Sequence, residues 1–335
     1  MTIKDLSAQT GYSVGTISRV LNNQPNVSTK ARDIIMRAAD EAGFQLNANA
    51  KQLKQHHGTA ILVVVKGTSN ELFAGLVEAL QTRIAPTDYP LVVDYIDEND
   101  NEVRRAVQLC REKKPQGVLF LGGNQENFLA DFDKITMPCV LITNDASALP
   151  FPNLSSVTSD DALAARMAID HLVSLGHRKI AVVGGNREVS DTTKLRYQGC
   201  MDAFRKHGIA FNEKLDYQAS RFSYADGYRA AKRLLARERE FTALFAMSDV
   251  MAIGAIRALR DAGKRVPEDV SVMGLDGLAI GNFTVPKLAT VCQSVDEIAQ
   301  RSLRLLMDNI EGRSKAQHET VPVCLAWKES ARRIN

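Results

Sequence analysis

Residues 13–22 read SVGTISRVLN and lie almost at the start of a chain of 335 residues. Ser13 is a typical helix N-cap, and the spacing of Ile17, Val20 and Leu21 places them on one side of a helix. The opposite side would carry Val14, Gly15, Ser18, Arg19 and Asn22. A helix with so few large apolar residues needs neighbours to complete a core, so the flanking sequence decides its role.

Helical patterns flank this stretch on both sides. Thr2 and Asp5 form a capping box for a helix that ends at Gly11, and Ser28 begins a third helix that ends at Gly43. Two short helices with a tight turn, completed by a third, describe a helix-turn-helix unit, whose second helix enters the major groove of DNA. The alternative is a three-helix cap without a DNA-binding role, and the geometry alone does not separate the two.

The distribution of charge favours DNA binding. Residues 1–57 contain seven Lys and Arg against four Asp and Glu, an excess that equals the net charge of +3 of the whole chain. The remaining residues hold 35 basic and 35 acidic side chains. A positive head on a neutral body suits contact with phosphates. Because the excess is small, it supports this interpretation without proving it.

Four long motifs resemble those of the lactose- and galactose-repressor (LacI/GalR) family. They are TIKDLSAQTGYSVGTISRVLNNQPNVSTKAR (2–32), HLVSLGHRKIAVVGG (171–185), SDVMAIGAIRALRDAGKRVPEDVSVMGLDG (248–277) and LATVCQSVDEIAQRSLRLLM (288–307). Their order and spacing match the family over nearly the whole chain. The resemblance implies a ligand-controlled transcription regulator, usually a repressor, that binds a palindromic double-stranded DNA operator as a homodimer, with a tetramer left open.

Composition agrees with an intracellular regulator and offers nothing for catalysis. No apolar run approaches the roughly 18 residues of a membrane span, and the N-terminus has no signal-peptide core. The five cysteines have no close pair such as CxxC, which favours reduced thiols over a disulfide or zinc framework. The GxxxxGK[ST] and HExxH motifs are missing from the sequence. We therefore expect a cytoplasmic protein that is not an enzyme and uses no metal or cofactor.

Beyond residue 60, apolar runs alternate with amphipathic helical patterns, as in AILVVV, GVLFL, KIAVV and VSVMGL. This alternation predicts parallel sheets joined by crossover helices. Two runs end alike, GVLFLGGN at Asn124 and IAVVGGN at Asn186, which indicates two related lobes with a ligand site at the carboxyl ends of the strands. The predicted fold is therefore an N-terminal all-α helix-turn-helix head and an α/β two-lobed, periplasmic-binding-protein-like sensor core.

The resemblance also implies domain boundaries. The helix-turn-helix domain would span 1–45, a hinge helix or linker 46–58, and the effector-binding and dimerisation domain 59–335. Within the latter, the first lobe would hold about 60–158 and 289–318, and the second about 159–288 and 319–335. The helix near 71–83 would supply much of the dimer interface through Leu72, Gly75, Leu76 and Ala79.

For DNA, the resemblance places base specificity at Val14 and Gly15, of which Val14 offers only an apolar contact and Gly15 no side chain. Thr16 and Arg19 remain able to hydrogen-bond. In the hinge, Leu53 would wedge between bases in the minor groove and Lys51 would contact phosphate. The full set of expected DNA-binding residues is Thr2, Ser13, Val14, Gly15, Thr16, Ser18, Arg19, Asn22, Asn26, Ser28, Asn47, Ala50, Lys51 and Leu53. Leu46 stands where the family often has proline, so this hinge helix would fray more easily.

For the effector, the family match points to Asp276 as an acceptor for sugar hydroxyls, Arg196 as a second polar contact and Phe222 as a ring against an apolar sugar face. The full set of expected effector-binding residues is Asn70, Phe73, Thr143, Arg196, Phe222, Ser248, Asp249, Asp276 and Gln293. A sugar is the leading effector class. The alternatives are a nucleobase or nucleoside effector on the same architecture, and a solute-binding protein without a regulatory role.

Overall fold

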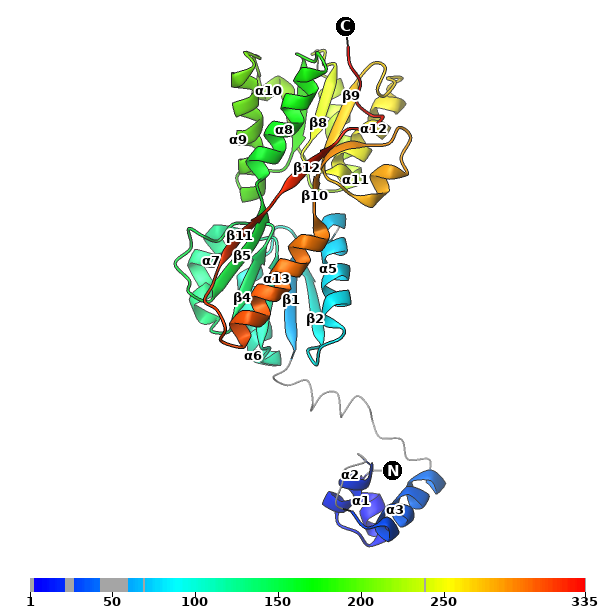
Figure 1. Ribbon diagram of the computed structural model, residues 1–335. Helices are drawn as coiled ribbons and strands as arrows, with labels where there is room; N and C mark the ends of the chain where they lie inside the picture. The colour runs from blue at the N-terminus through cyan, green and yellow to red at the C-terminus, as the bar shows by residue number, and fades with distance from the viewer. Residues whose placement is uncertain (1–2, 22–26, 43–59, 69, 238, 335) are drawn as a thin grey trace. The chain divides into compact units, whose positions relative to one another are not determined.

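A computed structural model describes residues 3–21, 27–42, 60–68, 70–237 and 239–334. The chain divides into two compact units, Met1–His57 and Gly58–Asn335, which are treated separately below (Figure 1). The sequence-based fold prediction is confirmed in both units. In the part of the chain that is described, no helix has the length and apolar content that crossing a membrane requires.

The first unit is a three-helix head. Its helices are α1 (Ile3–Thr10), α2 (Val14–Leu21) and α3 (Thr29–Glu41), and each contacts the other two. Leu6, Ile17 and Ile35 are fully buried at their centre. Ser13 caps α2 as predicted, because its hydroxyl accepts a hydrogen bond from the backbone N–H of Thr16 at 3.2 Å. Thr2 and Gly43, which were expected to bound the first and third helices, lie outside the described residues.

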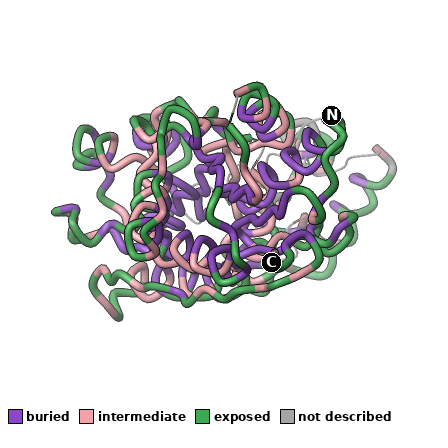
Figure 2. Tube along the Cα trace, turned by 90° about the horizontal axis from the view of Figure 1, so that it is seen from above, coloured by how far each residue is buried: buried purple, intermediate pink, exposed green. Residues whose placement is uncertain are grey.

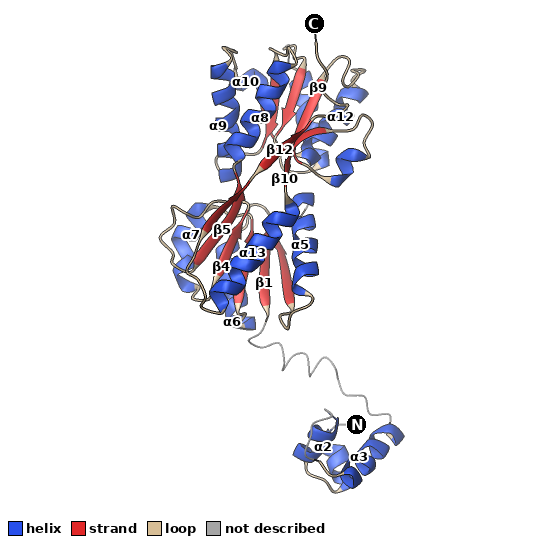
Figure 3. Cartoon of the chain, in the orientation of Figure 1, coloured by secondary structure: helices blue, strands red, loops and turns tan. Residues whose placement is uncertain are grey.

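The first lobe of the second unit is a parallel six-stranded sheet in the order β2-β1-β3-β4-β5-β11 (Figure 3). Its strands are β1 (Ile61–Lys66), β2 (Leu91–Ile96), β3 (Gly117–Leu121), β4 (Cys139–Ile142), β5 (Leu154–Ser159) and β11 (His318–Val321). The helical elements around it are α5 (Glu71–Ile84), α6 (Glu102–Lys113), α7 (Gln125–Asp131), the short 3-10 turn η1 (Phe132–Lys134) and α13 (Val295–Ile310). The core lies on both faces of the sheet, under α5 and α13 on one and under α6 and α7 on the other.

The second lobe is built alike, in the order β7-β6-β8-β9-β10-β12. Its strands are β6 (Ile180–Gly184), β7 (Tyr217–Ala219), β8 (Ala243–Ala246), β9 (Ser271–Asp276), β10 (Ala289–Gln293) and β12 (Val323–Ala326). Its helices are α8 (Asp161–Ser174), α9 (Asp191–Lys206), α10 (Glu213–Asp216), α11 (Tyr224–Leu235), α12 (Asp249–Asp261) and the 3-10 turn η2 (Ala279–Asn282). Strand β12 runs antiparallel to β10, while the other paired strands of this sheet are parallel. Figure 2 shows the buried stretches enclosed by exposed loops and helix turns.

The strand pairing corrects the predicted lobe boundaries by a few residues. Segment 289–293, expected in the first lobe, forms β10 and pairs with β9 and β12 of the second. Residues 319–321, expected in the second lobe, belong to β11 and pair with β5 of the first. The chain therefore changes lobe at the end of a hydrogen-bonded strand, where Ser294 caps α13, and not before the strand begins.

The expected dimer stripe on α5 packs within its own lobe. Leu72 and Leu76 are buried in the core that α5 shares with α13. A methyl group added at Gly75 would lie 3.8 Å from Val295 Cγ1, so this glycine also faces α13. Packing on a neighbouring helix thus accounts for part of the stripe, and the dimer face on α5 stays a prediction.

Glycines allow helices of the second lobe to cross with their backbones in contact. A methyl group at Gly254 of α12 would lie 2.1 Å from the carbonyl oxygen of Tyr224, and one at Gly227 of α11 would lie 2.5 Å from that of Met251. Both distances are far below a van der Waals contact. The α11–α12 pair therefore tolerates no side chain at either crossing point.

We expect Gly254→Ala to lower the free energy of unfolding of the core by about 2–3 kcal/mol, because the added methyl group must push two backbones apart. Gly75→Ala is the matched control, since its methyl group has room and alanine raises helix propensity by up to about 1 kcal/mol. Urea unfolding followed by circular dichroism measures both. Equal stability of the two variants would contradict the inferred backbone contact.

Candidate functional site

A cavity of about 610 Å³ lies between the two lobes of the second unit. Its walls come from the carboxyl ends of strands and the loops that follow them. Among the lining residues are Lys66 at the end of β1, Gly122 after β3, Thr143 after β4 and Asp276 at the end of β9. Ligands of open α/β sheets collect at this edge, and the volume is in the range of small-molecule sites. The cavity is therefore the candidate effector site.

Six of the predicted effector residues line this cavity. They are Asn70, Phe73, Thr143, Arg196, Phe222 and Asp276. They come from both lobes, as a site closed between two sheets requires. The prediction therefore brought together residues that are more than 200 positions apart in the sequence.

The other predicted residues, Ser248, Asp249 and Gln293, lie behind the wall. Ser248 caps α12 by accepting from the backbone N–H of Met251 at 3.4 Å. Asp249 is fully buried and accepts hydrogen bonds from Thr290 Oγ1 at 2.6 Å and from the N–H of Leu278 at 2.7 Å. The side chain of Ser248 thus caps α12, and that of Asp249 fastens α12 to β10 and to the loop after β9, instead of reaching into the cavity.

Gln293 is corrected in the same way, since it acts on a lining residue. Its Nε2 donates to Asp276 Oδ1 at 2.9 Å, and both side chains are buried. Asp276 has a φ of +128°, a backbone conformation that few side chains adopt. The amide of Gln293 therefore holds the carboxylate of a residue with a strained backbone in place at the cavity wall.

Asp276 belongs to a buried cluster of charges around Arg196. Arg196 Nε donates to Asp161 Oδ1 at 2.7 Å, and its Nη2 lies 3.6 Å from Asp276 Oδ1. Arg196 also donates to the carbonyl of Met247. Burial raises the pKa of Asp276 to about 7, although the attraction of Arg196 opposes this rise, and it raises the pKa of Asp249 to about 6. One guanidinium thus faces three buried carboxylates, and burial favours the protonated form of each of them.

Two phenylalanine rings of the cavity wall each pack on a glycine. Phe73 packs on Gly122, where a methyl group would lie 3.1 Å from the ring, and Phe222 packs on Gly185, where it would lie 2.9 Å from the ring. Both glycines belong to the repeated Gly-Gly-Asn stretches that follow β3 and β6. Each of these two glycines therefore leaves room for an aromatic ring at the cavity wall.

Contacts between the lobes at the cavity were missed by sequence reasoning. Arg221 of the second lobe pairs with Asp97 at 2.9 Å and with Glu98 at 2.5 Å, both in the loop after β2. Tyr224 donates to Glu71 across the same gap. The acidic run DEND (97–100) directly after a buried strand was an available signal, because the carboxyl ends of parallel strands meet at one edge.

Lys66 also lines the cavity, yet its charge is already compensated. Its ammonium pairs with the fully buried Glu102 at 2.5 Å. Glu102 in turn accepts from the backbone N–H of Asn124 at 2.7 Å. Since Arg196 and Arg221 hold carboxylates as well, these three cations give the cavity little unpaired positive charge for an anionic ligand.

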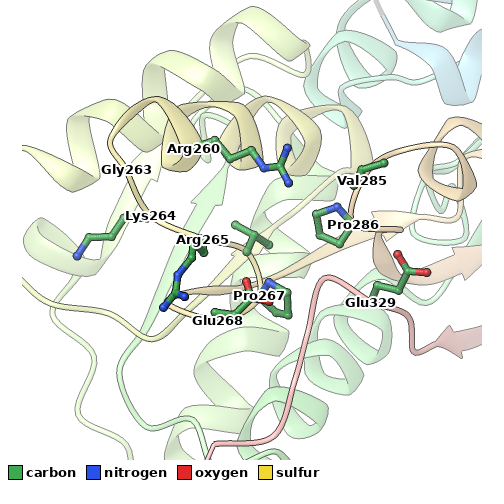
Figure 4. A pocket seen from close by; sticks show the side chains of 10 residues that line it. Arg260, Gly263, Lys264, Arg265, Pro267, Glu268, Val285, Pro286 and Glu329 are labelled. Carbon is green, nitrogen blue, oxygen red and sulfur yellow. The ribbon is translucent and has the colours of Figure 1, made fainter.

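A second hollow of about 690 Å³ lies on the second lobe alone (Figure 4). The end of α12 at Arg260, the loop 263–268, the Val285–Pro286 segment and Glu329 form its walls. Arg265 pairs with Asp269 at 2.9 Å, and most of the lining side chains are exposed. Buried polar groups line the interlobe cavity, whereas most side chains that line this hollow are exposed. We therefore take the interlobe cavity as the functional site.

The candidate DNA-binding face is on α2 of the head. Gly15 and Arg19 are exposed, and Thr16 is partly exposed with its hydroxyl 2.9 Å from that of Ser13. Ser28 accepts from the backbone N–H of Ala31 at 3.3 Å and so caps α3. Of Val14 and Ser18 only the helical backbone is described. The predicted contacts Thr2, Asn22, Asn26, Asn47, Ala50, Lys51 and Leu53 lie outside the described residues.

We expect Asp276→Asn to remove a pH dependence of stability. From about pH 4 to pH 7 the unfolded Asp276 is ionised while the folded one keeps its proton, because its pKa is raised from 3.8 to about 7. The stability that this group contributes is therefore complete below about pH 4 and is lost as the pH rises towards 7. The slope for one proton is at most about 1.4 kcal/mol per pH unit.

Urea unfolding of the wild type and the variant at steps between about pH 4 and pH 8 measures this difference. Asp269→Asn is the control. Pairing with Arg265 lowers the pKa of the Asp269 carboxyl, so this group stays ionised in the folded chain throughout this pH range. Parallel stability curves for the wild type and Asp276→Asn would contradict the buried-proton account.

Comparison with known proteins matches both units. Residues 2–47 match the family "Bacterial regulatory proteins, lacI family", and residues 169–331 match the "Periplasmic binding protein-like domain". The HTH-type transcriptional regulator MalR of Clostridium butyricum is 31% identical over 98% of this chain and 99% of its own. A transcriptional regulator CelR–cellobiose complex has a TM-score of 0.71 at 28% identity and covers 98% of this chain and 99% of its own.

The lac repressor dimer bound to operator and the anti-inducer ONPF shares the fold, with a TM-score of 0.78 at 24% identity and 99% of each chain covered. The head, the two parallel-sheet lobes and the relative at 31% identity lead to one assignment. This family consists of transcriptional regulators and not of enzymes. The chain is a member of the LacI family of transcriptional regulators and carries the family's periplasmic-binding-protein-like domain.

Proposed function

We propose that this regulator is a cytoplasmic repressor that binds a palindromic operator as a homodimer, and that an uncharged sugar or sugar derivative in the interlobe cavity controls its affinity for DNA. The observation that carries the ligand class is the buried Asp276–Arg196 pair beside the ring of Phe222. A carboxylate and a guanidinium hydrogen-bond neighbouring hydroxyls, while an aromatic ring packs on the apolar C–H face of a sugar.

The charges at the cavity favour a neutral ligand over a phosphorylated one. Lys66, Arg196 and Arg221 each already pair with a carboxylate, so a phosphate group at any of these three would have to break an ion pair, and the fourth cation of the lining, Arg233, is exposed. The CelR relative, whose structure holds cellobiose, supports an uncharged carbohydrate by analogy.

A nucleobase or nucleoside is the second candidate, because Phe73 and Phe222 line the cavity from opposite lobes. Two rings of this kind can sandwich a planar base. The amides of Asn70, Asn144 and Asn186 also line the cavity and offer both donors and acceptors for a base edge. A sugar remains the first candidate, because the Asp276–Arg196 pair can hydrogen-bond neighbouring hydroxyl groups.

On the DNA side, we propose that α2 reads the major groove with Val14, Gly15, Thr16, Ser18 and Arg19. Gly15 offers no side chain and Val14 only an apolar one, so Arg19 is the strongest candidate for a base contact. Its exposure at the end of α2 is compatible with this role. The hinge assignments, with Lys51 on phosphate and Leu53 as a wedge, remain part of the proposal.

A thermal-shift screen tests the effector class directly. The purified chain is heated with neutral mono- and disaccharides, the matching sugar phosphates, and nucleosides. A ligand at 100 times its dissociation constant stabilises the protein by about 2.7 kcal/mol, which is a measurable shift. Stabilisation by neutral sugars alone is expected. A response to sugar phosphates or nucleosides but not to neutral sugars would overturn the proposed class.

Phe222→Ala should weaken the sugar found in that screen about 10-fold or more, because the ring supplies apolar contact area in the cavity. Isothermal titration calorimetry gives the dissociation constants. Phe283→Ala is the matched control, since that ring is 81% exposed and does not line the cavity. Equal losses in the two variants would remove Phe222 from the site.

Arg19→Ala should abolish the preference for a DNA palindrome that the wild type selects from a random library. A bidentate contact from arginine to a base contributes about 1–3 kcal/mol of discrimination. Fluorescence anisotropy compares the selected palindrome with a scrambled duplex at fixed salt. Arg37→Ala, an exposed arginine on α3 of the same head, is the control and should keep the preference. An unchanged ratio in Arg19→Ala would exclude a base contact by Arg19.

A further inference from the structure

Two cysteines that are far apart in the sequence face each other in the second lobe. Strands β10 and β12 run antiparallel, and their register places Cys292 directly opposite Cys324. The Cβ atoms of directly opposite residues in such a pair lie about 4.5–5.5 Å apart, close to the separation that a disulfide spans. Both cysteines are free in this structure.

The two thiols differ in access to solvent. Cys324 lies on β12, at the edge of the sheet, and is exposed, whereas Cys292 is partly buried on β10. Burial raises the pKa of Cys292 to about 11, and the neighbouring Cys324 adds to this rise. Cys292 therefore keeps its proton at neutral pH, while Cys324 is the thiol that a reagent from solution meets first.

We propose that Cys292 and Cys324 form a reversible dithiol oxidation site, for which the oxidant is a hydroperoxide. The sulfur of Cys324 attacks the peroxide oxygen, the O–O bond breaks, and Cys324 becomes a sulfenic acid while an alcohol or water leaves. The sulfur of Cys292 then attacks that of Cys324, the S–S bond forms, and the hydroxyl leaves as water with the proton of Cys292. Two thiols lose two electrons in total, and the peroxide gains them.

The other cysteines are placed differently. Cys139 and Cys200 are fully buried, and burial raises the pKa of each thiol. Cys110 is half-buried near Cys139, and burial raises its pKa to about 11. Neither cysteine of the Cys110–Cys139 pair is exposed. The exposure of Cys324 is what singles out the Cys292–Cys324 pair.

The position of the pair gives its oxidation a structural consequence. Strand β10 leads directly into the first lobe through Ser294, and β12 is where the chain returns from β11. A disulfide would thus tie two of the segments that join the lobes. The site also adjoins the cavity wall, since Cys292 Sγ would lie 2.8 Å from a methyl group at Gly277 and the next residue, Gln293, holds Asp276.

The test oxidises the reduced full-length chain with hydrogen peroxide and counts thiols after denaturation. We expect two of the five thiols to be lost, a cross-linked peptide pair containing Cys292 and Cys324 that is two hydrogens lighter, and full recovery with dithiothreitol. The oxidised chain should melt at a higher temperature than the reduced one, because the bond restricts the unfolded chain.

Variants separate this pair from other oxidation. Cys292→Ser and Cys324→Ser should each abolish the intramolecular cross-link and the melting shift, and the control Cys110→Ser should keep both. Disulfide-linked dimers through Cys324, a cross-link between other cysteines, or retention of all five thiols would overturn the proposal. A lower melting temperature of the oxidised chain would show that the disulfide strains β10 and β12, and this would contradict the proposed stabilising bond between the two strands.

Discussion

The burial of Arg196 is the constraint on which the candidate site depends. Its guanidinium is held by Asp161 at the start of α8 and by the carbonyl of Met247 after β8, and it faces Asp276 at the end of β9. A charge taken out of water needs such partners, and losing one of them costs several kcal/mol. The ligand-facing wall is therefore a set of helix and strand ends that fix one another, and its polar groups are oriented before any ligand arrives.

Local patterns predicted much of this arrangement. The Ser13 cap of α2, the alternation of strands and helices and six cavity-lining residues follow from the sequence and from its family resemblance. These features depend on short-range spacing or on motifs with a fixed place in the fold. The positions of Asp276 and Phe222 are of this kind, since each follows a recognisable strand or loop.

What the sequence could not predict depends on pairing across long distances. Asp249 and Gln293 are polar, as ligand contacts are, but their side chains hydrogen-bond to Thr290 and Asp276 within the protein and do not line the cavity. The lobe boundary at Ser294 is set by hydrogen bonds of β10 to its neighbours, which no local pattern encodes. The cysteines, which looked scattered along the chain, become neighbours for the same reason, because strand register is a property of the sheet.

The pairing of Arg221 with Asp97 and Glu98 has a consequence for the conditions under which this regulator is studied. Arg221 and Asp97 are about half exposed, so dissolved ions screen their attraction. Closure of the lobes should thus weaken as ionic strength rises, and DNA affinity falls with salt for a separate reason, the release of counterions. Two salt effects of different origin then overlap in any titration of ligand against operator. Ionic strength is accordingly a variable of the lobe equilibrium itself.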